Sequence, residues 1–402
     1  MKHFKVALIG VGARGAGLYR VALKMRENVD YVAVCDPWEE RLHAFADSVE
    51  QGGRPRPAEY TDYKKCIDEA KPDAVVVATG WDFHLEVSMY AMEKGVAVAC
   101  EVGGAYSIQS LWELVRCYER TKTPIMMMEN CCYGRIELLA LKMKRMGVLG
   151  EIVHCEGGYR HDLRSEVTGD NGKNLKHYRV HQYQKRNSEN YPMHEIGPLA
   201  KLLDINCGNR FVSLHSTGSK SVGVEAYIKD KNIEVLKDAK YNQSDVVTTV
   251  IKCQNGETVV ITLDTCLPRY YSRGFTVQGT KGLIREDNQS VYLEEEFTEE
   301  CWDWTSQFNN IGKYYEKYEH KRWQGYKPGK DGHGGMDMLV FDGFFRALES
   351  GDPMPIDVYD MATWMSITPL SEQSMATGQS VAFPDFTDGK WIMRKNEFEL
   401  DE

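Results

Sequence analysis

The chain has 402 residues, long enough for two domains, and its composition of 42% hydrophobic and 27% charged residues is typical of a folded globular protein. Its formal net charge of -10 argues against a protein that wraps nucleic acid or lies on an anionic membrane, since neither partner offers cations in return. Eleven cysteines without a C-x-x-C pair predict reduced, buried thiols and no metal site.

The first predicted element is an apolar strand at residues 6–9, which leads into glycines at Gly10, Gly12 and Gly15. Apolar residues at helical spacing follow, so the context is strand, turn and helix. In such a turn the first glycine allows a sharp bend, the second lets the backbone approach a pyrophosphate, and the third lets helix and strand pack closely. A second strand, at residues 31–35, ends at Asp36, where a carboxylate would accept the ribose hydroxyls of NAD and repel the 2′-phosphate of NADP.

Strands and helices continue to alternate up to residue 129. Strands are expected at residues 73–79, 96–100 and 125–129, and helices at residues 37–51, 63–70, 84–94 and 108–121. This order predicts a doubly wound parallel sheet, whose ligand lies beyond the carboxyl ends of the strands. The side chains that follow two of these strands, Trp81 to His84 and Glu101, are therefore expected to face the cofactor, although each could be only a cap or a packing residue.

The pattern changes near residue 150. Segments of alternating hydrophobicity are joined by hairpin signals such as Asn255-Gly256, and they lie at residues 151–159, 211–217, 246–265 and 274–287. They predict an open, mainly antiparallel sheet, with helices from His194, at residues 336–349 and at residues 357–376. We therefore expect an α/β protein with an NAD-binding Rossmann domain at residues 1–130 and a substrate-binding α+β domain with the C-terminal helices at residues 131–402.

Location and assembly can also be predicted. No apolar run reaches membrane-spanning length, and the first strand begins close to the N-terminus, which leaves no room for a signal peptide. With the reduced thiols, this predicts a cytoplasmic protein. An open sheet with one uncovered face predicts a homo-oligomer, either a dimer or a tetramer.

A nicotinamide enzyme needs a group that moves a proton while hydride moves. His194 is the best candidate, because it starts a predicted helix whose partial positive charge favours a neutral imidazole, and Tyr191 lies three residues earlier. Further polar and aromatic side chains occur in predicted loops at residues 158–162, 178–179 and 267–273, and the last of these would suit the rim of a sugar site. Taken singly, each of these residues is more often structural.

Taken as a set, these residues resemble the Gfo/Idh/MocA group of nicotinamide enzymes, and within it glycoside hydrolase family 109, the NAD-dependent α-N-acetylgalactosaminidases. The matching motifs span nearly the whole chain and include GARG at residues 12–15, WDFH at 81–84, YPMH at 191–194 and GHGGMD at 332–337. Beside Gly10 and Gly12 of the turn, the resemblance implies NAD contacts for Arg14, Gly15, Asp36, Trp81, Asp82, Phe83, His84, Glu101, Val102 and Asn130. It implies substrate contacts for Tyr159, Arg179, Tyr191 to His194 and Tyr271, with Tyr191 also touching the cofactor.

The resemblance implies hydrolysis of a small glycoside by transient oxidation. Hydride passes from C3 of the sugar to NAD+, the C2 proton is removed, the aglycone leaves from C1, water adds, and hydride returns to C3. His194 is expected to act as the base near C3, with Tyr191 or Tyr159 as acid/base partners and Arg179 and Tyr271 as positioning groups.

Two alternatives remain at this stage, a sugar or cyclitol dehydrogenase and a non-catalytic dinucleotide sensor. The dehydrogenases of the group carry a catalytic Lys where this chain has Val102, which weighs against the first alternative. The number of polar aromatic loops in the second domain weighs against the second. The chain also departs from the family pattern at Gly103, where Pro is usual, and at Met193, where Thr is usual, and both departures bear on which sugar is accepted.

Overall fold

The computed structural model describes residues 2–296, 302, 304–328 and 332–400, which form two compact units. The first unit takes in Met1–Tyr133, Gly325–Met365 and Glu397–Leu400, and the second takes in Gly134–Gln324 and Ser366–Asn396. The units are thus interleaved along the chain. The functional boundary that we expect after residue 130 remains a prediction, because the compact units are defined by packing alone.

The first unit is built on a parallel sheet with the strand order β3-β2-β1-β4-β5-β6. Its strands are β1 (Phe4–Ile9), β2 (Val29–Cys35), β3 (Ala58–Tyr60), β4 (Ala74–Val77), β5 (Ala97–Cys100) and β6 (Ile125–Met127). Every residue of β4 and β5 is buried, as expected for a parallel sheet that is covered on both faces. The order reverses at β1, so the predicted doubly wound sheet is confirmed.

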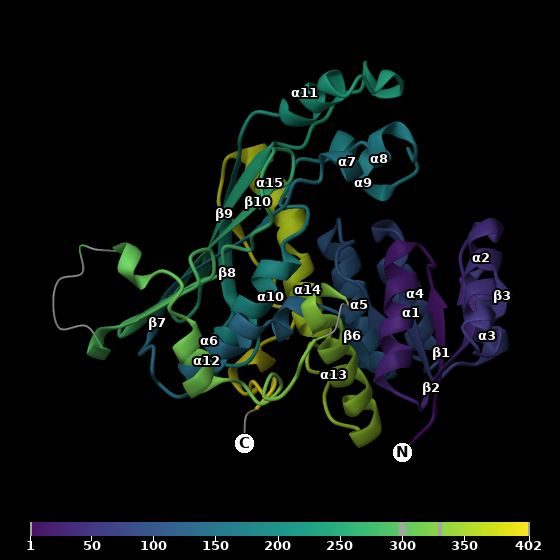
Figure 1. Cartoon of the computed structure of the whole chain (residues 1–402), viewed down its shortest axis with the longest axis horizontal. Helices are drawn as coiled ribbons and strands as arrows, with labels where there is room; N and C mark the ends of the chain where they lie inside the picture. Colours follow the sequence, from purple (N-terminus) through teal and green to yellow (C-terminus); the bar gives the residue numbers. More distant parts are fainter. Residues whose placement is uncertain (1, 297–301, 303, 329–331, 401–402) are drawn as a thin grey trace. The chain divides into compact units, whose positions relative to one another are not determined.

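Helices cover this sheet, namely α1 (Ala13–Met25), α2 (Glu39–Gln51), α3 (Tyr63–Ala70), α4 (His84–Glu93), α5 (Ile108–Thr121), α13 (Met336–Ser350) and α14 (Val358–Met365). The side chains of Asp62 and Ser107 accept backbone N–H groups at the starts of α3 and α5, which explains where these two helices begin. Helix α13 packs against α1, and α14 packs against α5 and β6, although both come from late in the chain (Figure 1).

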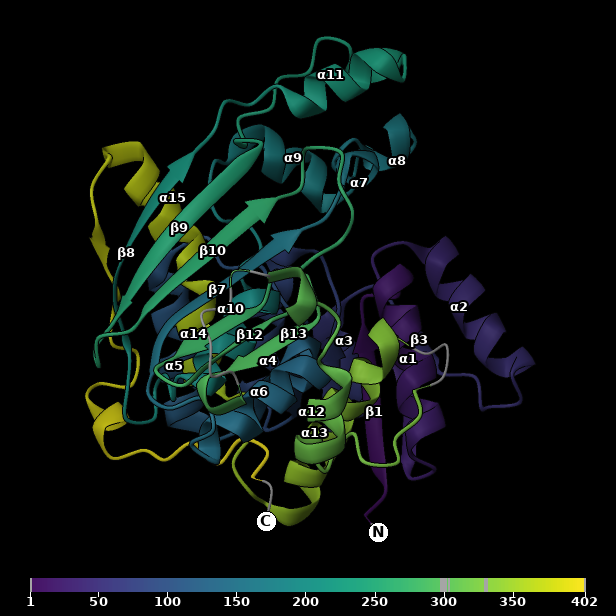
Figure 2. The same ribbon diagram turned by 60° about the vertical axis from the view of Figure 1, so that its left-hand side comes forward.

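The second unit holds a mixed sheet with the order β13-β12-β11-β7-β10-β9-β8-β14. Its strands are β7 (Ile152–Arg160), β8 (Phe211–Gly218), β9 (Val246–Cys253), β10 (Thr258–Asp264), β11 (Thr276–Gly279), β12 (Gly282–Arg285), β13 (Ser290–Leu293) and β14 (Val381–Ala382). Figure 2 shows β8, β9, β10 and β7 lying side by side. The predicted antiparallel character is confirmed for most pairs, but β7 and β10 run parallel.

The second unit also contains helices. They are α6 (Arg135–Arg145), α7 (Arg164–Val167), α8 (Gly169–Gly172), α9 (Tyr178–Lys185), α10 (Met193–Leu202), α11 (Gly223–Asp230), α12 (Gly312–Tyr318) and α15 (Ile367–Thr377). Helix α10 packs against β7 and α6, and α15 packs against β8. Residues along β10 alternate between buried and half-buried, so the two faces of this strand differ in exposure.

Short 3-10 helices link many of these elements, at Trp81–Phe83, Asn130–Tyr133, Glu234–Leu236, Glu294–Glu296, Trp304–Gln307, His333–Gly335 and Lys390–Ile392. None of the helices in the described part of the chain combines the length and the apolar composition that crossing a bilayer requires.

Candidate functional site

The glycine turn between β1 and α1 has the shape that a dinucleotide needs. Gly10 has a φ of +98°, and a Cβ on it would lie 2.4 Å from the carbonyl oxygen of Ala78. A Cβ on Gly15 would lie 1.9 Å from the carbonyl oxygen of Gly10, whereas a Cβ on Gly12 would meet nothing within 4 Å. Gly10 and Gly15 are therefore required by the shape of the turn, whereas Gly12 leaves open space where a pyrophosphate could approach the backbone. These are the roles predicted for the three glycines.

Asp36 lies just beyond the carboxyl end of β2 and is buried. One carboxylate oxygen accepts the backbone N–H of Val11 at 3.1 Å, and the other accepts that of Trp38 at 3.1 Å. The first of these bonds joins the acidic residue directly to the glycine turn. Asp36 is therefore held in a fixed orientation where the ribose of a dinucleotide is expected.

The loops after β4 and β5 are tied together by His84. Its ring nitrogens lie 2.9 Å from the carbonyl oxygen of Gly103 and 3.1 Å from that of Thr79, and burial lowers its pKa. Gly103 has a φ of +89°, and a Cβ on it would lie 2.5 Å from Nε1 of Trp81. Because the proline ring fixes φ near -65°, the proline of the family pattern does not fit this conformation. Contacts within the protein thus fix the positions of Trp81 and His84.

Three further predicted cofactor residues meet in a polar network of the first unit. Nε of Arg14 donates to the carboxylate of Glu101 at 3.0 Å, and both nitrogens at the end of its guanidinium donate to Asp337. Asn130 donates to the same Asp337 carboxylate at 2.7 Å. Val102 is buried beside Glu101. Asp337 belongs to a motif that the resemblance contains, but its sequence context gave no sign that it would reach the dinucleotide turn.

In the second unit the predicted substrate residues come together from separate elements. Tyr159 is the last residue but one of β7, and Tyr271 follows β10. Tyr191 lies just before α10, and His194 is the second residue of that helix. The ring of Tyr159 lies 4.6 Å from that of Tyr191 and 5.5 Å from that of His194, measured between centroids. The Tyr191 hydroxyl lies 3.4 Å from Nε2 of His194, so a proton can pass between the two groups. We call this set, with His161, the aromatic cluster.

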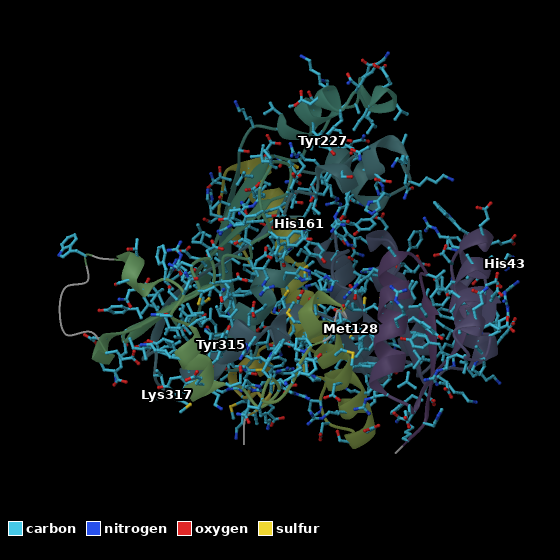
Figure 3. The ribbon with its side chains drawn as sticks, viewed as in Figure 1. His43, Met128, His161, Tyr227, Tyr315 and Lys317 are labelled. Atoms are coloured by element: carbon cyan, nitrogen blue, oxygen red, sulfur yellow. The ribbon has the colours of Figure 1, made fainter. Side chains whose placement is uncertain are left out.

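His161, which Figure 3 labels, joins the cluster although sequence reasoning gave it no role of its own, because its ring lies 5.9 Å from that of Tyr159 between centroids. Its Nδ1 lies 3.4 Å from the Tyr159 hydroxyl, and its ring lies 5.2 Å from that of Tyr271. Burial lowers the pKa of His161. An imidazole in this position can exchange a proton with Tyr159. The sequence signals for it were its place in a polar loop after a strand and its place in a stretch that matches the family, and neither gave it a role.

Arg179 lies on α9 beside the cluster and is buried. Nη1 of Arg179 donates to the carboxylate of Glu166 at 2.7 Å, and its guanidinium lies 5.6 Å from the ring centroid of Tyr191. The ion pair fixes the guanidinium, whose donors suit the hydroxyl and carbonyl oxygens of a sugar. The structure therefore brings Tyr159, Arg179, Tyr191, His194 and Tyr271 together within one unit.

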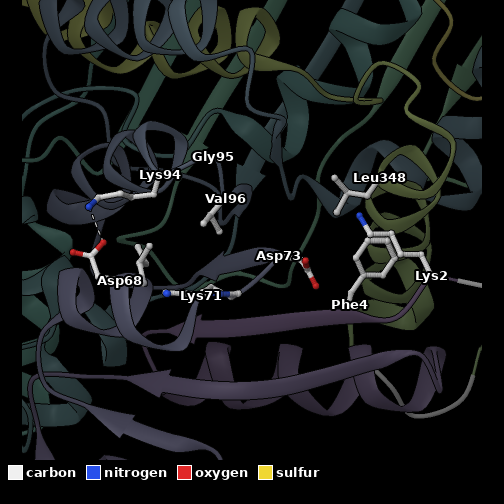
Figure 4. A pocket seen from close by; sticks show the side chains of 11 residues that line it. Lys2, Phe4, Asp68, Lys71, Asp73, Lys94, Gly95, Val96 and Leu348 are labelled. Atoms are coloured by element: carbon white, nitrogen blue, oxygen red, sulfur yellow. Dashed lines mark ion pairs between the residues drawn. The ribbon is translucent and has the colours of Figure 1, made fainter.

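A pocket of about 480 Å³ opens at the opposite end of the parallel sheet, at the amino ends of β1, β4 and β5 (Figure 4). Phe4, Asp73 and Val96 line it, and its rim carries an ion pair between Asp68 and Lys94 at 2.8 Å. None of the predicted site residues lines this pocket. Ligands of doubly wound sheets bind at the carboxyl ends, so this pocket is not the candidate site.

Comparisons with known proteins match both parts of the chain. Residues 133–393 match the family model described as "Glycosyl hydrolase 109, C-terminal domain", and residues 4–129 match "Oxidoreductase family, NAD-binding Rossmann fold". A glycosyl hydrolase family 109 protein of Stenotrophomonas maltophilia is 38% identical over 100% of this chain and 92% of its own length. An alpha-N-acetylgalactosaminidase of Tannerella forsythia is 36% identical over 98% of this chain and 89% of its own length.

Solved structures share the fold. An NAD binding oxidoreductase from Klebsiella pneumoniae has a TM-score of 0.70 at 16% identity, covering 95% of this chain and 99% of its own. A myo-inositol 2-dehydrogenase from Lactobacillus plantarum has a TM-score of 0.67 at 16% identity, covering 95% of this chain and 100% of its own. At this level of identity the likeness is one of architecture.

Proposed function

This chain belongs to glycosyl hydrolase family 109, and from that premise we propose that it hydrolyses α-N-acetylgalactosaminides or closely related hexosides, with NAD as a bound cofactor. The observation that carries the proposal is the aromatic cluster, because its tyrosines and histidines sit within reach of one another in a chain that also holds a dinucleotide turn. The sugar is taken from the relative of Tannerella forsythia, whose name gives that activity.

The residues present in the first unit fit NAD. A Cβ on Gly12 would enter open space where a pyrophosphate can approach, and Asp36 presents a carboxylate at the end of β2 for the ribose hydroxyls. When bound, NAD supplies a reversible hydride acceptor, so the sugar can be oxidised and reduced again without net redox change.

Proton movement falls to the second unit. We expect His194 to take the proton of the C3 hydroxyl and to share it with Tyr191, whose hydroxyl lies 3.4 Å away. The C3 ketone then acidifies the C2 proton, which Tyr159 removes with His161 as its partner. Loss of the aglycone from C1 follows by elimination, and water adds to the resulting double bond.

This assignment explains why the cluster is built of tyrosine, histidine and arginine. Ordinary glycosidases place two carboxylates across the glycosidic bond to stabilise a positively charged sugar. Elimination beside a ketone needs bases and donors for hydroxyl and carbonyl oxygens instead. Arg179, fixed by Glu166, and Tyr271 are suited to hold the sugar in that way.

A sugar or cyclitol dehydrogenase is the second candidate, because solved structures of the same fold include inositol dehydrogenases. The two functions differ in net cofactor turnover. A dehydrogenase accumulates NADH with each turnover, whereas the proposed glycosidase returns its hydride to the sugar.

The test mixes purified protein, NAD+ and a panel of nitrophenyl glycosides, and it follows nitrophenolate and NADH absorbance together. We expect many turnovers of nitrophenolate from the α-N-acetylgalactosaminide while NADH stays below the enzyme concentration. Steady NADH formation without nitrophenolate release would favour the dehydrogenase. No change in either absorbance would favour a dinucleotide sensor. His194→Ala should abolish release, and His154→Ala, on β7 with a hydrogen bond to Thr258, is the matched control.

We also propose that the protein works in the cytoplasm as a homo-oligomer. Ten cysteines of the described chain are free thiols, which suits a reducing compartment. Exposed Val153 on β7 and Val250 on β9 support association across the second sheet. Cell fractionation and light scattering of the purified protein test the two statements, and a secreted or monomeric protein would contradict them.

A further inference from the structure

One carboxylate in the first unit collects partners from three loops of the nucleotide-binding sheet. Asp337, the first acidic residue of α13, accepts hydrogen bonds from Nη1 of Arg14 at 2.7 Å and from Nη2 of Arg14 at 3.0 Å. It also accepts Nδ2 of Asn130 at 2.7 Å, and its second oxygen lies 3.0 Å from Nδ1 of His333. Through Arg14 the network reaches Glu101, since Nε of Arg14 donates to that carboxylate at 3.0 Å.

The network spans the sheet from the turn to the far strands. Arg14 follows β1, Glu101 follows β5 and Asn130 follows β6. Asp36, the expected ribose partner, follows β2 on the other side of β1. A dinucleotide whose adenosine ribose lies at Asp36 and whose pyrophosphate crosses the turn has its nicotinamide half toward β5 and β6. Asp337 therefore contacts residues expected on the nicotinamide side, whereas Asp36, the residue expected at the adenosine ribose, is not among its hydrogen-bond partners given above.

Burial makes this carboxylate a rigid anchor. Only 2% of the Asp337 side chain is exposed. Burial by itself would raise its pKa, but hydrogen bonds from His333 and Arg14 hold the pKa well below its usual range, so the group is charged at neutral pH. A charged, bidentate acceptor fixes the plane of the Arg14 guanidinium, which a neutral side chain in its place cannot do as firmly.

The chain before α13 is shaped to bring Asp337 to this position. A Cβ on Gly332 would lie 2.2 Å from the Asp337 carboxylate, and Gly335 has a φ of +96° directly before the helix. The hydroxyl of Tyr326 donates to the carbonyl oxygen of Gly335 at 3.1 Å, which holds the turn from outside. Gly332 therefore permits the close approach of the Asp337 side chain, and Gly335 permits the left-handed turn that precedes the helix.

We propose that Asp337 is a positioning residue for the cofactor: it orients Arg14 and Asn130, so the affinity for the nicotinamide half of NAD depends on a side chain that does not itself bind NAD. The inference rests on the NAD site of the proposed function. It goes beyond that function because it assigns a role to a residue of α13, far from the glycine turn in sequence.

The test measures dissociation constants directly, by titration calorimetry, for NAD+ and for AMP, which carries only the adenosine end. In Asp337→Asn we expect NAD+ to bind at least tenfold more weakly while AMP binds as it does to the wild type. Asp342→Asn is the matched control, because Asp342 also lies on α13 and accepts a hydrogen bond, at 3.0 Å, from the Arg26 guanidinium beyond the end of α1. We expect that control to bind NAD+ normally.

A second variant keeps the test decisive if Asp337→Asn does not fold. His333 is half exposed, so His333→Ala should fold, and it removes one of the partners that orient Asp337. We expect this variant to weaken NAD+ binding at least threefold. Unchanged NAD+ binding in Asp337→Asn, or in His333→Ala where the first variant is unfolded, would overturn the inference. Equal losses for NAD+ and AMP would also overturn it, since they would indicate general unfolding of the site. A wild type that binds no NAD+ would instead refute the proposed function.

Discussion

The glycine turn offers a pair of substitutions that separates ligand binding from folding. A methyl group on Gly12 meets no atom within 4 Å, and the φ of Gly12 is not positive, so Gly12→Ala fits the folded protein. A methyl group on Gly15 would lie 1.9 Å from the carbonyl oxygen of Gly10, so Gly15→Ala cannot fit unless the turn moves. The first substitution should therefore affect the ligand and the second the fold.

The expected magnitudes follow from these contacts. Gly12→Ala should change the free energy of unfolding by less than about 1 kcal/mol, and the lower entropy of the unfolded chain favours a small gain. Gly15→Ala should cost about 1–3 kcal/mol as an overpacked site, which corresponds to a fall in Tm of roughly 2–12 °C. For NAD+ we expect Gly12→Ala to weaken binding at least tenfold, or about 1.4 kcal/mol, because the methyl group occupies the space where the pyrophosphate approaches the backbone.

Thermal unfolding without ligand and calorimetric titration with NAD+ measure the two effects separately. Saturating NAD+ should raise the Tm of the wild type by mass action and raise that of Gly12→Ala much less. Wild-type affinity for NAD+ in Gly12→Ala, with its Tm unchanged, would refute the reasoning, because it would mean that the pyrophosphate does not pass over Gly12.

Three other substitutions test further features. Burial raises the pKa of Glu189 to about 8. Between about pH 4.5 and pH 8 the Glu189 carboxyl is therefore protonated in the folded state and ionised in the unfolded state. As the pH rises across this window, the free energy of unfolding should therefore fall, and in the wild type it should fall by roughly 3–5 kcal/mol more than in Glu189→Gln. Urea unfolding at several pH values measures both profiles, and parallel profiles would contradict the prediction. Gly103→Pro, which installs the residue usual in the family, should lower Tm and weaken NAD+ binding, because the φ of +89° is closed to proline, and calorimetry would detect unaltered binding if the loop simply rearranges. Tyr191→Phe should reduce glycoside turnover by roughly 10²–10⁴-fold if its hydroxyl shares the proton of His194, with NAD+ affinity as the measure of an intact site, whereas full turnover would remove it from that role.

The sequence predicts the first sheet well because its signals are local. Short all-apolar runs such as those of β4 and β5, set between helical patterns, favour strands buried on both faces, and the glycines of the turn lie between a strand and a helix as a dinucleotide turn requires. Strand β3 has only three residues, too few for a periodic pattern, and its place in the sheet depends on pairing with β2. The same holds for the parallel pairing of β7 and β10, since a hairpin signal at Asn255-Gly256 specifies β9 and β10 alone.

The candidate site shows the same division between local and distant information. Resemblance to a family pointed to Tyr159, Tyr191 and His194, and the fold places their rings in contact. The partnership of Arg14 with Asp337 was not predicted, because an arginine in a glycine turn and an aspartate at a helix start carry no sign of each other across the chain. Such contacts depend on the tertiary fold, and the periodic patterns of a single sequence do not indicate them.

The interleaving of the two units bears on how the chain is synthesised. Helices α13 and α14 complete the first unit, and Phe345 of α13 packs its ring 5.5 Å from that of Phe4 on β1. A nascent chain that has reached Tyr133 therefore still lacks Gly325–Met365, the segment that covers this apolar surface. At about 5–20 residues per second, the ribosome needs roughly 10–50 s more to deliver that segment. During this interval the surface that this segment covers stays exposed, and a fragment cut after residue 130 is expected to aggregate rather than to bind NAD.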